Sequence, residues 1–230
     1  MLAVEKLSFA YSGVQALFDV SLSADKGQVT CILGRNGVGK TTLLKNIIGL
    51  LRPTAGRIAL DDLNLTPLRA NGRARAGVGL VPQGRQIFPR LTVQENLRVG
   101  LEAARKGRGV SSEIYELFPV LKEMSSRMGG DLSGGQQQQL AIARALVGEP
   151  SVLLLDEPTE GIQPNIVKQI GSVLKSLAKD RGMTVVLVEQ YLDFVRTIGD
   201  VFYVLNRGRV VANGDTSELN DDLVGRHLSV

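Results

Sequence analysis

The sequence has no tryptophan, a single cysteine and a single histidine among its 230 residues. The lone cysteine, Cys31, cannot form a disulfide within the chain, and we expect it to fill space in the core. The lone histidine, His227, leaves no cysteine and histidine cluster that would bind zinc. Zinc, haem and iron–sulfur chemistry are therefore not expected, and the composition is typical of a reducing compartment such as the cytosol.

Long apolar runs are also missing. The apolar stretches at 152–155 and 185–188 are four residues long, whereas a membrane-spanning helix needs about 20 apolar residues. No apolar segment of the signal-peptide kind follows Met1, so we expect the chain to stay in the compartment where it is made. With 43% hydrophobic and 22% charged residues, the chain has the composition of an ordinary globular domain.

Aromatic residues make up only 4% of the chain, and the net charge is a modest +4. The charge is unevenly spread, because residues 69–108 hold nine basic residues against Glu95 and Glu102. Such a segment forms a solvated face, or it contacts anionic lipid or a protein partner beside a membrane. Nucleic acid is not an expected partner, because base stacking needs several aromatic rings and Phe88 is the only one in this segment.

Apolar stretches of strand character alternate with apolar residues at helical spacing, which predicts an α/β fold around a parallel sheet. Strands are expected at 2–9, 16–22, 29–33, 79–81, 152–155, 184–188, 201–205 and 210–212, and helices at 40–51, 93–105, 112–124, 134–147, 165–179 and from 191. We expect a single domain, 1–230, in which residues 1–84 and 151–230 form the α/β core and residues 85–150 form an inserted helical subdomain.

Residues 34–41 read Gly-Arg-Asn-Gly-Val-Gly-Lys-Thr, which satisfies G-x-x-x-x-G-K-[ST] between a predicted strand and a predicted helix. The glycines let backbone N–H groups point at phosphate oxygens, and the helix N-terminus adds partial positive charge. Lys40 would hold the β- and γ-phosphates, and the Thr41 hydroxyl would bind Mg²⁺. The predicted nucleotide contacts of this loop are Gly34, Asn36, Gly37, Gly39, Lys40, Thr41 and Thr42.

Two carboxylates, Asp156 and Glu157, follow the apolar strand expected at 152–155. Ligands of open α/β sheets bind at the carboxyl ends of the strands, so both acids are placed to act on a bound nucleotide. We expect Asp156 to face Mg²⁺ through the water shell of the ion. Glu157 is expected to orient the attacking water and to accept its proton.

The segment Leu-Ser-Gly-Gly-Gln at 132–136 precedes a predicted helix, and with it the whole chain resembles the ATPase subunit of an ATP-binding cassette (ABC) transporter. The resemblance implies a P-loop NTPase core of the RecA kind, an antiparallel β subdomain and a helical subdomain. It also implies two ATPase chains packed head to tail, with each ATP between the phosphate loop of one chain and Ser133, Gly135 and Gln136 of the other. A helix N-terminus is a suitable second site for that anion.

Further site residues follow from the same resemblance. Tyr11, 29 residues before Lys40, matches the aromatic residue that stacks on adenine. Gln83 matches the glutamine that contacts Mg²⁺ and the attacking water, on a loop that faces the membrane subunit. Residues 84–90, which include Phe88 in the basic segment, are therefore the expected docking surface for that subunit.

The sequence departs from the family pattern at two positions. Gln190 stands where the family usually has a histidine that contacts the γ-phosphate, and Gln163 stands where it commonly has an aspartate at the dimer contact. An amide donates a hydrogen bond but cannot carry the charge of imidazolium. We include Gln190 with Glu157 and Gln83 among the catalytic residues, and we expect hydrolysis at this phosphate loop to be slower than at a partner loop that retains a histidine.

Gln190, together with residues 84–89, narrows the resemblance to importers of the branched-chain amino acid type. Within that group, the segments 34–40, 130–139 and 157–166 resemble urea-importer ATPases. The resemblance implies a second ATPase subunit, identical or paralogous, two transmembrane permease subunits and an extracytoplasmic substrate-binding protein. It places the chain in the cytoplasm, bound to the inner face of the plasma membrane.

Other functions remain open at this stage. A soluble cassette ATPase acting on DNA or ribosomes is less favoured, because the interval between Lys40 and Ser133 leaves no room for a long coiled-coil insertion. A weakly hydrolysing regulatory subunit would account for Gln190 and Gln163, although Glu157 argues against complete loss of activity. A kinase is not favoured, because nothing resembles a lid or an acceptor site.

Overall fold

The structure is a computed structural model that describes residues 1–103 and 109–227, with only the backbone described at Asp221 and His227. Arg105, Lys106 and Arg108 of the basic segment, and the end of the helix expected at 93–105, lie outside the described residues.

Ten strands and nine α-helices are found in the described part of the chain. The strands are β1 (Leu2–Tyr11), β2 (Val14–Ala24), β3 (Val29–Leu33), β4 (Ala55–Leu60), β5 (Leu63–Asn64), β6 (Val78–Val81), β7 (Val152–Asp156), β8 (Thr184–Glu189), β9 (Val201–Asn206) and β10 (Arg209–Asp215). The helices are α1 (Lys40–Ile48), α2 (Ala70–Arg75), α3 (Val93–Gly100), α4 (Ser112–Leu117), α5 (Pro119–Glu123), α6 (Gly134–Leu146), α7 (Pro164–Arg181), α8 (Leu192–Ile198) and α9 (Asp221–His227).

The larger sheet has the strand order β10-β9-β3-β8-β7-β6, and every pair in it is parallel except β10 with β9. Strands β3, β7 and β8 are buried along their whole length, as expected for apolar runs covered on both faces. The register pairs Leu33 with Glu189 and Asp156 with Val188, so the carboxyl ends of these three strands lie at one edge of the sheet.

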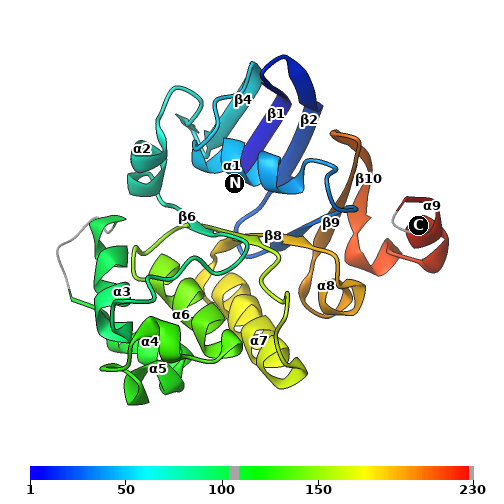
Figure 1. The fold of residues 1–230 in the computed structure, drawn as a ribbon. Helices are drawn as coiled ribbons and strands as arrows, with labels where there is room; N and C mark the ends of the chain where they lie inside the picture. The colour runs from blue at the N-terminus through cyan, green and yellow to red at the C-terminus, as the bar shows by residue number, and fades with distance from the viewer. Residues whose placement is uncertain (104–108, 228–230) are drawn as a thin grey trace.

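Successive residues of β3 pack into two different cores. Cys31 belongs to the core that α6, α7 and α8 form on one face of the sheet, and Ile32 belongs to the core that contains α1 on the other face. Figure 1 shows α6 and α7 below the sheet and α1 above it. Cys31 is fully buried, and burial raises the pKa of its thiol, which confirms the expectation that it fills core space.

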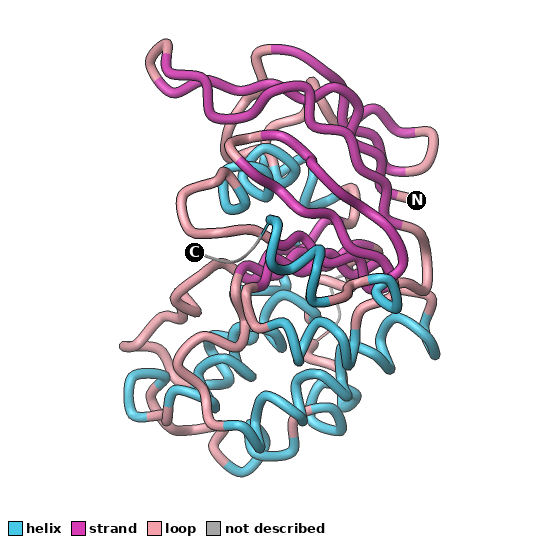
Figure 2. Tube along the Cα trace, turned by 90° about the vertical axis from the view of Figure 1, so that its right-hand side faces the viewer, coloured by secondary structure: helices cyan, strands magenta, loops and turns pink. Residues whose placement is uncertain are grey.

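A second, antiparallel sheet of four strands, in the order β2-β1-β4-β5, covers α1 from the side opposite the larger sheet. Figure 2 shows this sheet as a separate layer at the top of the molecule. Strands β4 and β5 and helices α2 and α9 were not expected from the sequence. Only the last three residues of β4 are buried and both residues of β5 are exposed, so these strands carry little apolar pattern.

Three predicted helices end or break elsewhere than expected. Helix α1 ends at Ile48 because Gly49 takes a left-handed conformation with φ of 84° and its N–H bonds to the Asn46 carbonyl, so Pro53 is not the terminator. The helix expected at 112–124 is two helices, since Pro119 disfavours helical conformation in the residue before it. The α-helix expected at 93–105 ends at Gly100, and a 3₁₀ helix, Leu101–Ala103, follows it.

In the described residues between β6 and β7, α3 to α6 are joined by loops and no strand occurs, apart from an isolated bridge between Thr92 and Met128. The division into 1–84, 85–150 and 151–230 is consistent with this arrangement and stays a prediction. In the part of the chain that the structure describes, no helix combines the length and the apolar character needed to cross a bilayer.

Arg73 in α2 is buried and closes the C-terminal end of α1. Its guanidinium donates hydrogen bonds to four carbonyl groups, those of Asn46, Ile47, Thr66 and Leu68.

Substitution Arg73→Met should lower the free energy of unfolding by about 3 kcal/mol, because it removes these charge-assisted bonds and leaves buried carbonyls unpaired. Arg69, the exposed residue directly before α2, provides the control. Arg69→Met should change the free energy of unfolding, measured in urea, by less than about 0.5 kcal/mol. Equal effects would contradict this role of Arg73.

Candidate functional site

The predicted phosphate loop connects β3 to α1 at the carboxyl end of the larger sheet. Gly34 begins it with φ of 154°, and Gly37 and Gly39 have φ of 79° and 110°. A Cβ atom at Gly34 would lie 2.4 Å from the carbonyl oxygen of Leu205, so no other residue fits there without a shift of the backbone. The loop thus packs closely against β9. It leads directly into the N-terminus of α1, where backbone N–H groups can bind an anion.

Lys40, the first residue of α1, is buried inside this loop. Its Nζ donates hydrogen bonds to the carbonyl oxygens of Gly34 at 2.7 Å and Arg35 at 2.9 Å, and lies 3.6 Å from Oε1 of Glu157. Burial lowers the pKa of the Lys40 ammonium, and the negative charge of Glu157 opposes this shift. The cation is therefore positioned by its own loop and by the carboxylate, as a phosphate-binding lysine must be.

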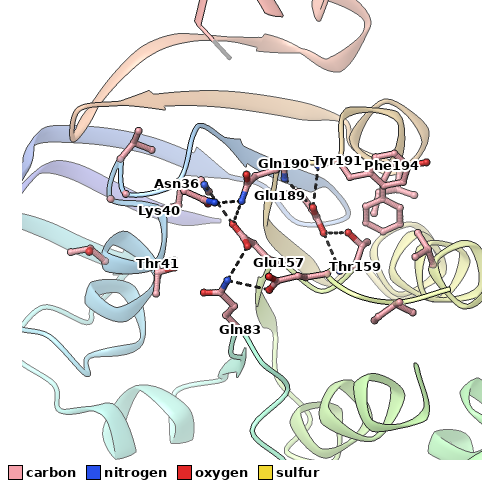
Figure 3. Close-up of a pocket in the computed structure, with 18 of the residues that line it drawn as sticks. Asn36, Lys40, Thr41, Gln83, Glu157, Thr159, Glu189, Gln190, Tyr191 and Phe194 are labelled. Atoms are coloured by element: carbon pink, nitrogen blue, oxygen red, sulfur yellow. Dashed lines mark hydrogen bonds and ion pairs between the residues drawn. The ribbon is translucent and has the colours of Figure 1, made fainter. Parts of the chain in front are cut away.

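Glu157 lies at the centre of the site, where Figure 3 shows the side chains of Lys40, Gln83 and Gln190 directed toward it. Its Oε2 accepts a hydrogen bond from Nε2 of Gln83 at 3.0 Å, and its Oε1 accepts one from Nε2 of Gln190. The backbone N–H of Glu157 donates to the carbonyl of Val188 at 2.9 Å. Both carboxylate oxygens therefore accept a hydrogen bond from an amide, and these contacts fix the orientation of the side chain that is predicted to act as general base.

Gln190 connects Glu157 to the phosphate loop. Its Nε2 also donates to Oδ1 of Asn36 at 2.7 Å. Gln83 makes a parallel connection, since its Nε2 donates to Oε2 of Glu160 at 3.2 Å as well as to Glu157. The three residues predicted to be catalytic, Glu157, Gln83 and Gln190, are thus in direct contact.

Asp156, the last residue of β7, is only 4% exposed, and its Oδ1 has no hydrogen-bond partner among the described residues. Burial raises the pKa of Asp156, and a hydrogen bond with the Thr41 side chain opposes this shift. An unpaired buried carboxylate oxygen beside a hydroxyl is a donor set that suits a hard cation such as Mg²⁺. Thr41 and Asp156 therefore fit the predicted metal site, whereas Gln83 is directed toward Glu157 and Glu160.

The raised pKa of Asp156 has a measurable consequence for Asp156→Asn. Above the ordinary aspartate pKa of 3.8, the unfolded chain exposes this charge to water, whereas the folded chain must bury it, so the charge lowers stability at neutral pH when no cation is bound. In Mg²⁺-free buffer Asp156→Asn should be more stable to urea than the wild type at pH 7, and the difference should disappear as pH falls toward 3.8. Mg²⁺-dependent turnover should be lost. A less stable variant at pH 7 would contradict this.

Most of these residues line one cleft of about 1760 Å³, whereas Gly34 and Asp156 are not among its lining residues. The predicted site residues that line it are Tyr11, Asn36, Gly37, Gly39, Lys40, Thr41, Thr42, Gln83, Glu157 and Gln190. Tyr11 is 45% exposed and packs edge-on against Phe9, and its hydroxyl lies 3.3 Å from Oγ1 of Thr42. Its ring is accessible for a flat adenine base, although the stacking role stays a prediction. From the phosphate loop the cleft extends along α7 and α8.

Ser133, Gly135 and Gln136 are not part of that cleft. They line a separate pocket of about 550 Å³ together with Gly161 and Gln163. Ser133 caps α6: its Oγ accepts from the N–H of Gln136 at 3.3 Å, and its own N–H donates to Oε1 of Gln136 at 2.9 Å. The cleft that contains Lys40 and the pocket that contains Ser133 share no lining residue.

The loop after β6, expected to dock on a membrane subunit, has an unusual backbone. Arg85 and Gln86 both have positive φ, 67° and 45°, directly after Gly84. Phe88 is 45% exposed, and the guanidinium of Arg144 lies 5.1 Å from the centre of its ring and donates to the carbonyl of Gln86 at 2.8 Å. Phe88 is thus presented on the surface, as expected from the sequence.

Two polar residues of the site were not among the predicted site residues. Thr159, two positions after Glu157, and Glu189, at the end of β8, are both buried and hydrogen-bonded to each other. The signal that the sequence offers for Glu189 is its position directly after the apolar stretch of β8.

Curated proteins of similar sequence are transport ATP-binding proteins. The high-affinity branched-chain amino acid transport ATP-binding protein BraG of Pseudomonas aeruginosa is 41% identical over 213 residues, which cover 92% of this chain and 91% of BraG. The probable branched-chain amino acid transport ATP-binding protein LivF of Archaeoglobus fulgidus is 38% identical, over 95% of this chain and 94% of LivF.

Solved structures of the cassette MJ0796 have the same fold. Its dimeric structure, a bacterial ABC transporter cassette, matches with a TM-score of 0.84 at 29% identity over 94% of this chain and 99% of that chain. Its dimeric post-hydrolysis state bound to ADP and Pi also gives a TM-score of 0.84, at 27% identity, with the same coverage. The predicted fold class is therefore confirmed.

The sequence profile of the family described as "ABC transporter" matches residues 17–160, which include both Lys40 and Glu157. Together with the 41% identity to a transport ATP-binding protein over 92% of the chain, this match establishes the family. The chain belongs to the ABC transporter family and is an ATPase subunit of this family.

Proposed function

We propose that the chain is the ATP-hydrolysing subunit of an importer for a small polar solute. The observation that carries this proposal is the position of Glu157, which contacts Lys40, Gln83 and Gln190 at the carboxyl end of β7. In this geometry Lys40 binds the β- and γ-phosphates, and Glu157 orients water against the γ-phosphate and accepts its proton. Mg²⁺, held by Thr41 and Asp156, would neutralise phosphate charge.

Each ATP in the working complex contacts two ATPase subunits. The separation of the Ser133 pocket from the Lys40 cleft supports this arrangement, because Ser133 then serves the nucleotide of the partner subunit. The dimeric structure of MJ0796 supports it as well. ATP binding closes the two subunits and hydrolysis reopens them, whether the partner is a second copy or a paralogue.

The membrane contact of this subunit is the surface of residues 84–90, which carries the exposed Phe88. Gln83 precedes this surface directly and donates to Glu157, so a change at the γ-phosphate reaches the docking loop within a few residues. We propose that two permease subunits bind here, on the cytoplasmic side of the plasma membrane, and that a substrate-binding protein acts on the outer side.

Urea is our proposed cargo, from the resemblance of the segments 34–40, 130–139 and 157–166 to urea-importer ATPases. Branched-chain amino acids are the alternative, which the names of BraG and LivF favour. The test is ATP-dependent uptake of labelled urea and labelled leucine by the reconstituted complex that copurifies with this chain from its native membrane. Urea uptake that stops with Glu157→Gln supports the proposal, and uptake of leucine alone would replace it by the alternative.

Gln190 provides a prediction about rate. Gln190→His should raise ATP turnover of the assembled complex by several-fold, because imidazolium adds a positive charge that the amide lacks next to the γ-phosphate. The variant should also gain a dependence on pH between about 6 and 8, where histidine titrates and glutamine does not. Unchanged turnover and an unchanged pH profile would show that Gln190 is an adequate substitute for histidine.

A further inference from the structure

The carboxylate of Glu189 connects two loops that both carry residues of the ATP site. Its Oε1 accepts from the N–H of Thr159 at 3.1 Å and from the Thr159 hydroxyl at 2.6 Å. Its Oε2 accepts from the backbone N–H groups of Gln190 at 2.9 Å and Tyr191 at 3.3 Å. Figure 3 shows this carboxylate between the two loops. Glu189 therefore joins the segment after β7 to the segment after β8 with two bonds to each.

The side chains of Glu189 and Thr159 are both buried. Glu189 is 3% exposed and Thr159 is 9% exposed, so water does not replace these bonds readily. A buried carboxylate is costly unless hydrogen bonds compensate it, and here four donors do so. An aliphatic side chain at this position would not need such compensation, which points to a role for the carboxylate in the placement of the two loops.

Each of these loops carries a catalytic residue. Glu157 stands two residues before Thr159, and Gln190 follows Glu189 directly and donates to Glu157. The loop after β7 continues through Gly161 and Gln163, which line the Ser133 pocket. The placement of Thr159 therefore affects both the Lys40 cleft and the pocket that faces the partner subunit.

We propose that Glu189 is a positioning residue for ATP hydrolysis, which holds the amide of Gln190 against Glu157 by fixing the loops after β7 and β8 to one another. This inference rests on the proposed role of Glu157 and Gln190 in hydrolysis. It assigns no contact with ATP to Glu189, which acts through Gln190 and Thr159.

Glu189→Gln is the sharpest substitution, since it keeps the size of the side chain. Its amide oxygen can accept from one loop, but its NH₂ group then faces the donors of the other loop, and that loop is released. Small displacements of catalytic groups cost up to about 100-fold in rate, so we expect a kcat for ATP that is 10- to 100-fold lower. The KM for ATP should change by less than about threefold, because Lys40 and Tyr11 are untouched.

Thr159 provides a matched pair of variants. Thr159→Val keeps the shape and the backbone donor but removes the hydroxyl that donates to Glu189, so kcat should fall several-fold. Thr159→Ser retains the hydroxyl and should restore a kcat within about twofold of the wild type. This pair carries the test if Glu189→Gln does not fold, as judged from its thermal unfolding midpoint.

The decisive experiment is a double-mutant cycle on steady-state ATP hydrolysis by the full chain in its assembled complex, with Glu189→Gln, Gln190→Ala and both together. If Glu189 acts by positioning Gln190, its substitution lowers kcat in the wild type but has little further effect in the Gln190→Ala background. A full multiplicative loss in that background, an unchanged kcat, or a higher KM with constant kcat would overturn the inference. If the wild-type complex fails to hydrolyse ATP, the proposed function itself fails, and the two failures remain distinguishable.

Discussion

Replacement of Glu157 by glutamine is expected to lower the turnover number for ATP by about 10² to 10⁴-fold, the usual contribution of a general base. Glutamine keeps the shape of the side chain but cannot accept the proton of the attacking water. It also removes a negative charge 3.6 Å from Nζ of Lys40. The Glu157 carboxylate then no longer competes with the triphosphate for the Lys40 ammonium. ATP binding should therefore be retained or strengthened.

Glu160→Gln is the matched control for this substitution. Glu160 is an exposed carboxylate that accepts from the same Gln83 amide at 3.2 Å, but it does not contact Lys40 or Gln190 in the described contacts. Its substitution should lower turnover by less than about fivefold. Steady-state hydrolysis and equilibrium binding of labelled ATP, measured on the same preparations, separate the two variants. Undiminished turnover and transport with Glu157→Gln would favour a regulatory subunit over a motor.

Substitutions at Lys40 and at Ser133 are both expected to abolish ATP hydrolysis, for different reasons. Lys40→Ala should abolish hydrolysis by weakening phosphate binding, whereas Ser133→Arg should abolish hydrolysis in the dimer and leave ATP binding by the separate chain intact. The two substitutions affect different pockets. Lys45→Ala, at an exposed lysine of the same helix, is the control for Lys40→Ala and should bind ATP normally.

If each ATP is bound by two subunits, the two inactive variants should complement each other. A mixed dimer of Lys40→Ala with Ser133→Arg contains one site in which both substitutions meet and one site in which Lys40 and Ser133 are intact. Coexpressed variants should thus recover part of the wild-type turnover, whereas each variant alone should not. No recovery in purified mixed dimers would indicate that Lys40 and Ser133 act within one chain.

Local signals in the sequence predicted the elements that position the site. The largely apolar runs at 29–33, 152–155 and 184–188 predict strands, and β3, β7 and β8 have the expected bounds to within one residue. The helix expected at 134–147 is α6, which ends one residue earlier. The glycine-rich loop placed Lys40 correctly at the first position of α1. The structure brings Tyr11 and the predicted phosphate-loop residues other than Gly34 into one cleft, whereas Ser133, Gly135 and Gln136 line another pocket. The chemical roles of all these residues stay predictions.

Long-range contacts account for what the sequence did not reveal. Strand β4 is stabilised by pairing with β1. Its first three residues, which include Arg57, are exposed and have no apolar pattern that would indicate a strand. Helix α2 is short and includes Gly72, and it is held by the contacts of Arg73 with carbonyls near the end of α1. The role of Glu189 depends on Thr159, 30 residues earlier in the chain.

The central claim is that one triphosphate is bound from both sides, by Lys40 of one subunit and by Ser133 of the partner subunit. A structure of the Glu157→Gln transporter complex saturated with ATP and Mg²⁺ tests it most directly. The account predicts the γ-phosphate within hydrogen-bond distance of Nζ of Lys40 and of Oγ of Ser133 across the subunit boundary. Ser133 facing solvent, with no phosphate opposite to it, would contradict the account.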